Sequence, residues 1–254
     1  MTQPMQDRVA LVTGAAGGIG RATALAFAAR GAAVAAADVN AAGAEETARA
    51  ISEAGGRALP LTVDVSRADS VQAMVDATVA HFGRLDFAHN NAGIAYTEDQ
   101  AAATIDHDEG VWDRIIAVNL KGVWLCMKSE LPHMLDRGGA IVNTSSILGL
   151  VGGPGFSAYV ASKHGVAGIT KTAALEYGRF NVRVNAVCPG LIDTPMVAPL
   201  ITDEDRRQAA LRSQVIRRPG APEEVAAAVV WLCSDEASFV TGTLMSVDGG
   251  QYAH

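Results

Sequence analysis

Tyr159 and Lys163 are the two residues whose types and spacing most directly indicate chemistry. They stand four positions apart in the stretch SAYVASK, so in a helix their side chains share one face and reach each other. A free tyrosine titrates at about pH 10, and a nearby cation stabilises the phenolate and lowers that pKa. The pair therefore predicts a catalytic base with its activator. The alternative is a solvated pair on a helix surface, for which the same spacing is common.

A glycine-rich turn follows the first apolar run of the chain. The stretch TGAAGGIGRATALAFAARG comes directly after VALV and spaces Gly14, Gly18 and Gly20 as GxxxGxG. Glycine lets the backbone approach a ligand closely, and the first amides of the following helix attract a phosphate. The strand, turn and helix together predict dinucleotide binding, whereas the glycines alone are a weak motif.

Further polar residues stand at the ends of later predicted strands. Asp38 closes the second strand eighteen residues after Gly20, where a doubly wound fold places an acid that accepts hydrogen bonds from the adenosine ribose. The alternative is that Asp38 caps the next helix, a role that Asn40 would fill equally well. Ligands of open α/β sheets bind at the carboxyl ends of strands. The next two strand ends carry Asp64 and Val65, and then Asn91, Ala92 and Gly93 within NNAG.

Two more candidates come from a strand end and from a helix. The fifth strand ends in NTSS, so Ser145 and Ser146 emerge at the same edge of the sheet. Asn119 lies in the helical stretch IIAVNLKGVW, although asparagine is a poor helix former. Its side chain is therefore exposed, bonded to a break in the backbone, or functional.

The elements that position these residues alternate between short apolar runs and longer segments of helical period. Strands that are apolar throughout are buried on both faces, which predicts a parallel sheet covered by helices on both sides. We therefore predict an α/β, doubly wound fold with one seven-stranded parallel sheet in a single domain over residues 1–254. The strands are predicted at 9–12, 32–38, 58–65, 87–90, 140–145, 182–187 and 244–247, and the helices at 19–30, 41–54, 69–82, 111–135, 157–177 and 222–233.

Two long segments, 94–110 and 191–219, do not follow this alternation. Long irregular connections in a compact α/β domain usually cover a site, and we expect about 191–219 to be a substrate-covering loop. The run from Asp106 to Glu109 has consecutive acidic residues around a histidine, which favours a solvated helix start over a metal site. We predict no metal.

Composition narrows the class of protein. The 254 residues are 49% hydrophobic, enough for one large core, and the net charge of −7 without a basic run argues against nucleic acid. The three cysteines are far apart in the sequence, as expected in a reducing compartment. The longest wholly apolar stretch is nine residues, VAAAVVWLC, too short for a membrane span. These features predict a cytoplasmic protein with no membrane partner.

In order along the chain, these motifs resemble the short-chain dehydrogenase/reductase family from Val9 to Gly250. The match comprises TGAAGGIG, Asp38, Asp64, NNAG, Asn119, Ser146, YVASK, PGLIDTPM at 189–196 and the closing VDGG. The resemblance implies a Rossmann fold and an NAD-dependent enzyme with Asn119, Ser146, Tyr159 and Lys163 as catalytic residues. Ser146 is preferred to Ser145 because it precedes Tyr159 by thirteen residues, the usual spacing in the family.

The resemblance also implies a role for each group. Tyr159 is the general base, Lys163 lowers the pKa of Tyr159 and holds the nicotinamide ribose, and Asn119 orders a water that relays the proton. The carboxylate of Asp38, with no cation at Val39 or Asn40, favours NAD over NADP. The implied cofactor contacts are Gly14, Gly18, Ile19, Gly20, Asp38, Asp64, Val65, Asn91, Ala92, Gly93, Tyr159, Lys163, Pro189, Gly190, Ile192 and Thr194.

The implied substrate is an apolar secondary alcohol, with cyclic alcohols included, or its ketone. Its contacts are expected from Ser146, Leu148, Tyr159 and Met196, with Ile147, Val151, Phe156 and Val197 as further apolar residues of the cleft or of the core. One alternative is a 3-oxoacyl-carrier-protein reductase, whose acidic partner favours a basic docking face. A second is a cofactor-sensing binding module, which typically lacks the tyrosine or the lysine. Small and apolar residues on several faces of helix 157–177 predict a homotetramer.

Overall fold

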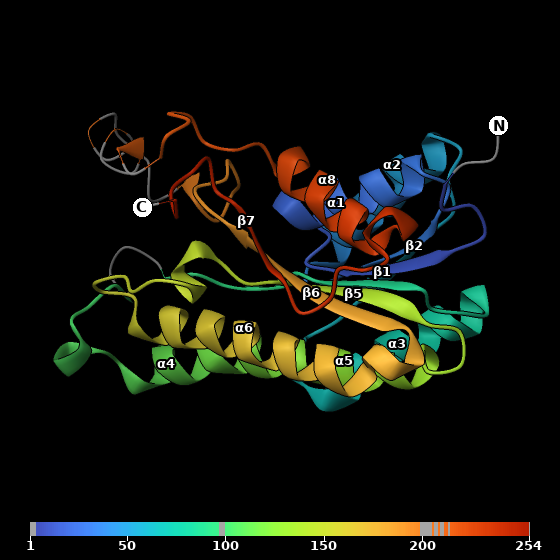
Figure 1. Cartoon of the computed structure of the whole chain (residues 1–254), viewed down its shortest axis with the longest axis horizontal. Helices are drawn as coiled ribbons and strands as arrows, with labels where there is room; N and C mark the ends of the chain where they lie inside the picture. The colour runs from blue at the N-terminus through green and yellow to red at the C-terminus, as the bar shows by residue number, and fades with distance from the viewer. Residues whose placement is uncertain are drawn as a thin grey trace.

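Seven parallel strands form one sheet in the order β3-β2-β1-β4-β5-β6-β7 (Figure 1). The computed structural model describes residues 4–96, 100–198, 205, 208, 211–212 and 214–253. The order reverses direction between β1 and β4, and this switch point lies beside the glycine turn that follows β1. The strands are β1 (Val9–Thr13), β2 (Ala33–Asp38), β3 (Ala58–Thr62), β4 (Phe87–Asn90), β5 (Gly139–Thr144), β6 (Val182–Pro189) and β7 (Leu244–Val247). The predicted α/β parallel sheet is confirmed.

Helices cover both faces of the sheet (Figure 1). One face carries α1 (Gly18–Ala29), α2 (Ala41–Glu53) and α8 (Pro222–Cys233). The other face carries α3 (Ala68–Phe82), α4 (Glu109–Ile116), α5 (Gly122–Glu130) and α6 (Ser157–Tyr177). Short 3-10 turns lie at η2 (Thr104–Asp106), η4 (Leu131–His133), η5 (Ile147–Gly149), η6 (Gly178–Phe180) and η8 (Asp235–Ala237), and a π-helical segment, η3, spans Ala117–Lys121.

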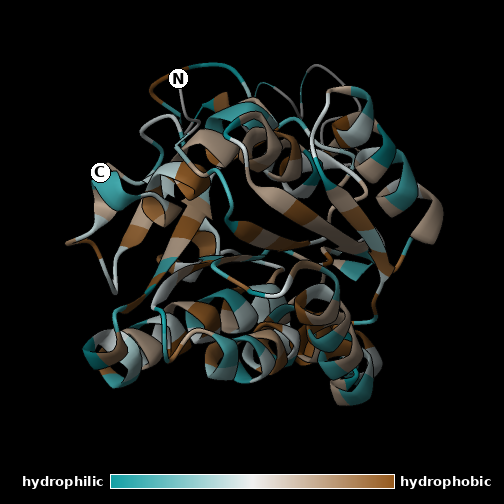
Figure 2. Cartoon of the chain, turned by 90° about the vertical axis from the view of Figure 1, so that its right-hand side faces the viewer, coloured by the Kyte–Doolittle hydropathy of each residue, from teal (hydrophilic) through white to brown (hydrophobic). Residues whose placement is uncertain are grey.

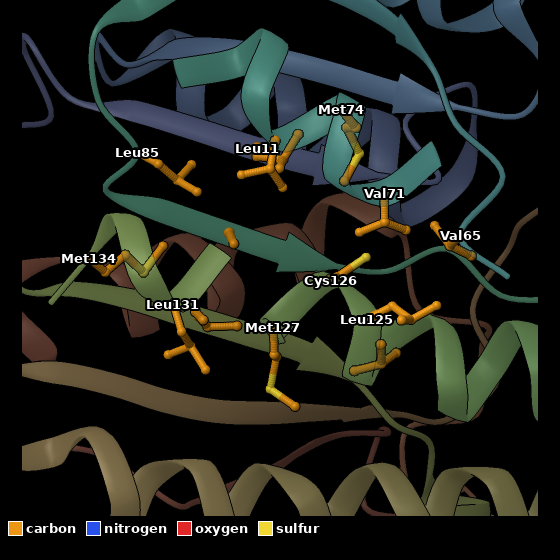
Figure 3. Close-up of a cluster of buried hydrophobic side chains, with 14 of the residues drawn as sticks. Leu11, Val65, Val71, Met74, Leu85, Leu125, Cys126, Met127, Leu131 and Met134 are labelled. Atoms are coloured by element: carbon orange, nitrogen blue, oxygen red, sulfur yellow. The ribbon is translucent and has the colours of Figure 1, made fainter. Parts of the chain in front are cut away.

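Two apolar cores fill the space between the sheet and its helices. One core joins the sheet to α3, α5 and α6, and Figure 3 labels Leu11, Val71, Met127 and Leu131 among its side chains. The other joins the sheet to α1 and α8 around Phe27. The strands are largely hydrophobic along their length in Figure 2. None of the helices in the described part of the chain is long and apolar enough to cross a lipid bilayer.

The expectation of strands buried on both faces holds for the interior of the sheet and not for its edges. β1 and β4 are buried throughout, whereas the edge strands β3 and β7 are mostly half-exposed. β3 also ends at Thr62 rather than at the predicted residue 65. Its pairing stops where β2 ends, and the N–H of Asp64 donates to the Ser70 hydroxyl instead of a strand. The edge strand is therefore shorter because it has no further partner.

The prediction of one continuous helix at 111–135 is wrong. It consists of α4, the π-helical segment η3, α5 and the short turn η4 in succession. A π turn inserts one extra residue into the helical repeat, and such insertions are frequent at functional sites. Here the insertion turns the buried Asn119 toward the segment that follows β4. Helices α6 and α8 have the predicted bounds.

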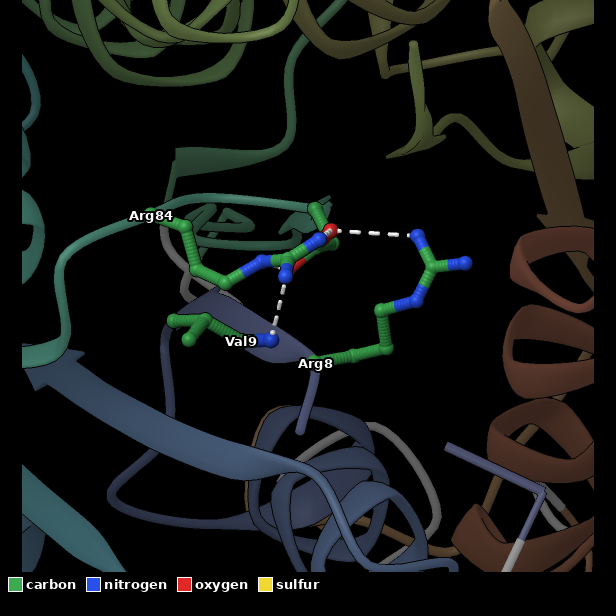
Figure 4. Close-up of polar contacts among 4 residues, drawn as sticks. Arg8, Val9 and Arg84 are labelled. Carbon is green, nitrogen blue, oxygen red and sulfur yellow. Dashed lines mark hydrogen bonds and ion pairs between the residues drawn. The ribbon is translucent and has the colours of Figure 1, made fainter. Parts of the chain in front are cut away.

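The amino-terminal edge of the sheet is held by one buried carboxylate, Asp86 (Figure 4). Asp86 accepts hydrogen bonds from the backbone N–H of Val9 at 2.9 Å and from Arg84 Nε at 2.7 Å, and pairs with Arg8 Nη1 at 3.2 Å. The burial of a charge is tolerable because both oxygens have charged or N–H donors. This cluster ties β1 to the start of β4 at the edge opposite the site described next.

Candidate active site

A cavity of about 280 Å³ opens at the carboxyl ends of the strands. It is lined by residues that follow β1, β2, β4, β5 and β6 and by residues of α6. The site residues predicted from sequence that line it are Gly14, Gly18, Ile19, Asp38, Asn91, Ala92, Gly93, Ser146, Tyr159, Lys163, Pro189, Gly190, Ile192, Thr194 and Met196. Residues from across the chain, predicted from separate motifs, thus meet in one place.

The glycine turn between β1 and α1 needs glycine for two physical reasons. Gly14 and Gly18 have φ angles of 71° and 50°, a region that side chains with a Cβ atom rarely adopt. A Cβ atom on Gly20 would lie 2.0 Å from the carbonyl oxygen of Gly14. The glycine turn therefore folds back on the first turn of α1. The N-cap residue of this helix is Gly17, so no side chain covers the first amides of α1.

Asp38 ends β2 and faces the same turn. Its Oδ2 accepts from the N–H of Ala16 at 2.9 Å, and its Oδ1 accepts from the N–H of Asn40 at 2.9 Å. The alternative role as a helix cap falls to Asn40, whose side chain accepts from the N–H of Gly43 at the start of α2. The Asp38 carboxylate lines the cavity, while Arg21, the basic residue just beyond the glycine turn, pairs with Glu46 at 3.9 Å.

A buried hydrogen-bond network joins the glycine turn to the strand that carries the serines. Thr144 donates its hydroxyl proton to Asn91 Oδ1 at 3.3 Å, so the 2.9 Å contact with His89 Nε2 requires an N–H on that nitrogen. Asn91 Nδ2 in turn donates to the carbonyl of Thr13 at 3.1 Å. Burial lowers the pKa of His89 to about 3, so the ring is neutral at physiological pH. The network fixes β5 relative to β1 across β4.

Lys163 is buried beneath this network. Its ammonium Nζ donates to the carbonyl of Thr144 at 2.9 Å and lies 5.4 Å from the centre of the Tyr159 ring. Loss of hydration lowers the pKa of Lys163 to about 8. Tyr159 and Lys163 therefore do share one face of α6, and that face is the wall of the cavity rather than solvated helix surface.

The expected lowering of the Tyr159 pKa is wrong for the protein alone. Removal of the phenol oxygen from bulk water raises the pKa of Tyr159, and its hydrogen bond with Ser146 acts in the opposite direction. The desolvation effect is the larger because the phenolate would lose its hydration. The Tyr159 phenol is therefore protonated at neutral pH.

The two adjacent serines have different partners. The Ser145 hydroxyl donates to the carbonyl of Lys163 at 2.9 Å, which ties β5 to α6. The Ser146 hydroxyl accepts from the N–H of Leu148 at 3.1 Å and acts on the Tyr159 phenol to lower its pKa. The geometry therefore supports Ser146, rather than Ser145, as the serine that acts beside Tyr159.

Asn119 is bonded to an irregular backbone segment, one of the three possibilities left open by the sequence. Its Oδ1 accepts from the N–H of Ile94 at 2.8 Å, and its Nδ2 donates to the carbonyl of Ile94 at 2.8 Å. This pair of bonds holds the segment after β4 against η3. A water-ordering role for Asn119 stays a prediction.

Some predicted residues lie beside the cavity rather than on its wall. Val65 belongs to the apolar core, and Asp64 accepts from the N–H and hydroxyl of Ser66 in a turn after β3. Leu148 packs near Gly153, where an added Cβ atom would lie 3.0 Å from it. Part of the predicted loop 191–219 lies outside the described residues, and its first part, with Met196 and Val197, lines the cavity. Ile94 and Thr144 were not predicted and line it as well.

The donors in this cavity fit a dinucleotide. The glycine turn and the first amides of α1 suit a pyrophosphate. The absence of a side chain at Gly14 keeps this space open, because a Cβ atom there would lie 2.7 Å from the Asn91 side chain. The Asp38 carboxylate at the end of β2 suits ribose hydroxyls. Lys163 and Tyr159 line the same cavity. No group of three or more His, Cys, Asp or Glu side chains within the described ranges could hold a metal ion.

Comparison with known proteins identifies relatives over the whole chain. A family profile described as enoyl-(acyl carrier protein) reductase matches residues 14–252. The chain is 50% identical to cis-4-hydroxycyclohexanecarboxylate dehydrogenase of Sinomonas cyclohexanicum, with both chains covered completely. It is 42% identical to a 3-oxoacyl-[acyl-carrier-protein] reductase of Thermotoga maritima, over 97% of this chain and 98% of the relative. The crystal structure of levodione reductase superposes with a TM-score of 0.91 at 41% identity, covering 98% of this chain and 99% of that chain.

The glycine turn offers a direct test of its geometry in the protein alone. We expect Gly20→Ala to lower the free energy of unfolding by about 2 kcal/mol or more, because the new methyl group collides with the Gly14 carbonyl. Gly17→Ala is the matched control, since its Cβ atom meets nothing within 4 Å and its φ of −167° suits any residue. Urea unfolding measures both. Equal stability of the two variants would contradict the close approach in the turn.

Proposed function

The chain belongs to the short-chain dehydrogenase/reductase family, and on that premise we propose that it interconverts a secondary, ring-borne alcohol and the corresponding ketone, with NAD as cofactor. The observation that carries the proposal is the meeting of Ser146, Tyr159 and Lys163 in the cavity that also contains the glycine turn and Asp38. When bound, the nicotinamide dinucleotide supplies the acceptor or donor of hydride.

Proton transfer is the task of Tyr159. In the direction of ketone reduction its hydroxyl protonates the oxygen of the substrate, and the raised pKa keeps the phenol protonated at neutral pH. In the direction of oxidation the phenolate takes the proton of the substrate hydroxyl. Because the phenolate fraction grows with pH, we infer that oxidation becomes faster as the pH rises.

The neighbouring side chains orient the substrate and favour the charged form of Tyr159. The Ser146 hydroxyl, which lines the cavity beside Tyr159, is placed to donate a hydrogen bond to the substrate oxygen. The Lys163 ammonium is fixed by the Thr144 carbonyl and has two further protons for a ribose hydroxyl. Asn119 acts through the Ile94 backbone and, as proposed from sequence, through an ordered water.

The apolar wall of the cavity favours a ring-borne alcohol over an acyl-carrier substrate. Ile94, Met196 and Val197 supply apolar contacts beside the reactive groups. The relative named for a hydroxycyclohexane substrate is also more similar to the chain than the acyl-carrier reductase. The net charge of −7 does not suit an acidic carrier protein. A binding module without chemistry is disfavoured because Tyr159 and Lys163 are both present in the cavity.

We also propose a homotetramer in a reducing, cytoplasmic compartment. Cys126, Cys188 and Cys233 are buried free thiols, in keeping with that compartment. Val166 and Ala173 of α6 no longer support assembly, because both are buried against the chain's own sheet. The support comes instead from apolar side chains left in solvent, Leu175 at 87% and Trp124 at 46% exposure.

The proton-transfer role predicts the effect of Tyr159→Phe. We expect kcat for a cyclic alcohol such as cyclohexanol to fall by at least about 100-fold, because the variant lacks the oxygen that carries the proton. The dissociation constant of NAD should change by less than about twofold, since the ring and Lys163 stay in place. Tyr177→Phe, at the other end of α6, is the control. Turnover of Tyr159→Phe near that of the parent would overturn the assignment.

The position of Asp38 predicts the cofactor preference. We expect kcat/KM to favour NAD over NADP by at least about tenfold, because the 2′-phosphate would approach a carboxylate. In Asp38→Ser with Val39→Arg the preference should move toward NADP, as Val39 is 73% exposed and an arginine there can reach a phosphate. Parallel measurements with the two cofactors decide, and a parent enzyme that prefers NADP would contradict the proposal.

The oligomeric proposal is tested by the mass of the protein in solution. We expect light scattering at micromolar concentration to give four times the chain mass of 26.3 kDa, because assembly would bury the exposed Leu175 and Trp124. A mass of one chain would exclude the tetramer.

A further inference from the structure

Helix α6 carries Tyr159 but has no cap of its own. Its N-cap residue is Phe156, whose side chain cannot accept a hydrogen bond from the first-turn amides. Ala158, the residue directly before Tyr159, is fully buried, so water does not reach its N–H. A buried N–H without an acceptor is strongly destabilising. The first turn of this helix therefore depends on an acceptor from elsewhere in the chain.

Tyr96 supplies that acceptor. Its hydroxyl oxygen accepts from the N–H of Ala158 at 2.9 Å and lies 2.9 Å from Nε2 of His107. With its oxygen accepting from Ala158, Tyr96 donates its phenol proton to Nε2 in the His107 tautomer that leaves this nitrogen unprotonated. Tyr96 is only 4% exposed, and its ring meets the His107 ring edge-on at 5.2 Å between centres. Two bonds and a ring contact thus hold one hydroxyl in place.

The same residues pack around Tyr159. Tyr96, Ile115 and Ala158 form a small apolar cluster of their own, and Ile94, Phe156 and Tyr159 pack against it. The Tyr96 ring also lies 5.5 Å from the Phe156 ring. Ile94 is held from the other side by the two bonds of Asn119. The segment after β4, helix α4 and the start of α6 therefore meet at Tyr96.

We propose that Tyr96, oriented by His107, is a positioning residue for Tyr159. The inference rests on the proposed function, because it assigns Tyr159 the proton transfer. Tyr96 does not line the cavity. It acts by fixing the backbone of Ala158 and hence the hydroxyl of the next residue, where a displacement of about 1 Å is enough to slow a reaction about 100-fold. His107, which the sequence placed in a solvated helix start, is the partner that holds Tyr96.

Amide hydrogen exchange tests the positioning without any substrate. In Tyr96→Phe the N–H of Ala158 loses its acceptor, and we expect it to exchange at least about tenfold faster than in the parent protein. Tyr177→Phe removes a hydroxyl from the other end of α6 and should leave the exchange of Ala158 unchanged. An unchanged exchange rate in Tyr96→Phe, or an equal increase in Tyr177→Phe, would overturn the proposal.

Steady-state kinetics with NAD and cyclohexanol test the consequence for catalysis. We expect Tyr96→Phe and His107→Leu to lower kcat about tenfold with an NAD dissociation constant within twofold of the parent. His107→Gln keeps an acceptor for the Tyr96 proton and should restore most of kcat. A general loosening of the fold would weaken NAD binding as well, and His107→Gln would not differ from His107→Leu. Either result would refute a positioning role.

Tyr159→Phe, measured alongside, separates this inference from the proposed function. If Tyr159→Phe is inactive and Tyr96→Phe keeps the kcat of the parent, only the positioning role fails. If Tyr159→Phe keeps its turnover, the assignment of the proton transfer fails and the positioning role fails with it.

Discussion

All seven strands run in the same direction, so every carboxyl end and its polar backbone groups arrive at one edge of the sheet. At this edge the regular ladder stops, and the remaining donors and acceptors have to be paired by side chains. Thr13, Asn91 and Thr144 do so across three neighbouring strands. The same pairing leaves the cavity lined with backbone amides, glycines and a few directed polar groups. The site is thus a consequence of how the sheet ends.

Helix α6 is attached to that edge by hydrogen bonds to the end of β5 and to the segment after β4. The Lys163 ammonium donates to Thr144, Ser145 donates to the Lys163 carbonyl, and the Ala158 amide donates to Tyr96. A buried lysine is costly for stability, as its lowered pKa indicates, and a leucine there would pack without that cost. Stability is given up here for a fixed charge beside Tyr159, a pattern typical of functional sites.

Much of the fold could be predicted because the inner strands and most helices have clear periodicity. The bounds of β4, β7, α6 and α8 agree with those predicted from sequence. The failures have specific causes. The π turn at Asn119 preserves the helical composition of its segment, so no residue pattern reveals it. β3 ends early because β2 offers no further pairing partner. The end of β3 therefore depends on the length of the neighbouring strand and not on the residues of β3 itself.

The sequence by itself determined the residue types of the site, its glycine turn and the order of strands and helices, because these follow from local periodicity and from motifs within one segment. Only the tertiary structure decided which polar groups are desolvated and which contacts they make. Burial reversed the expected direction of the Tyr159 pKa, and packing brought His107 to Tyr96, eleven residues away in the sequence. Hydration and contact both depend on residues distant in sequence, whose positions no local pattern specifies.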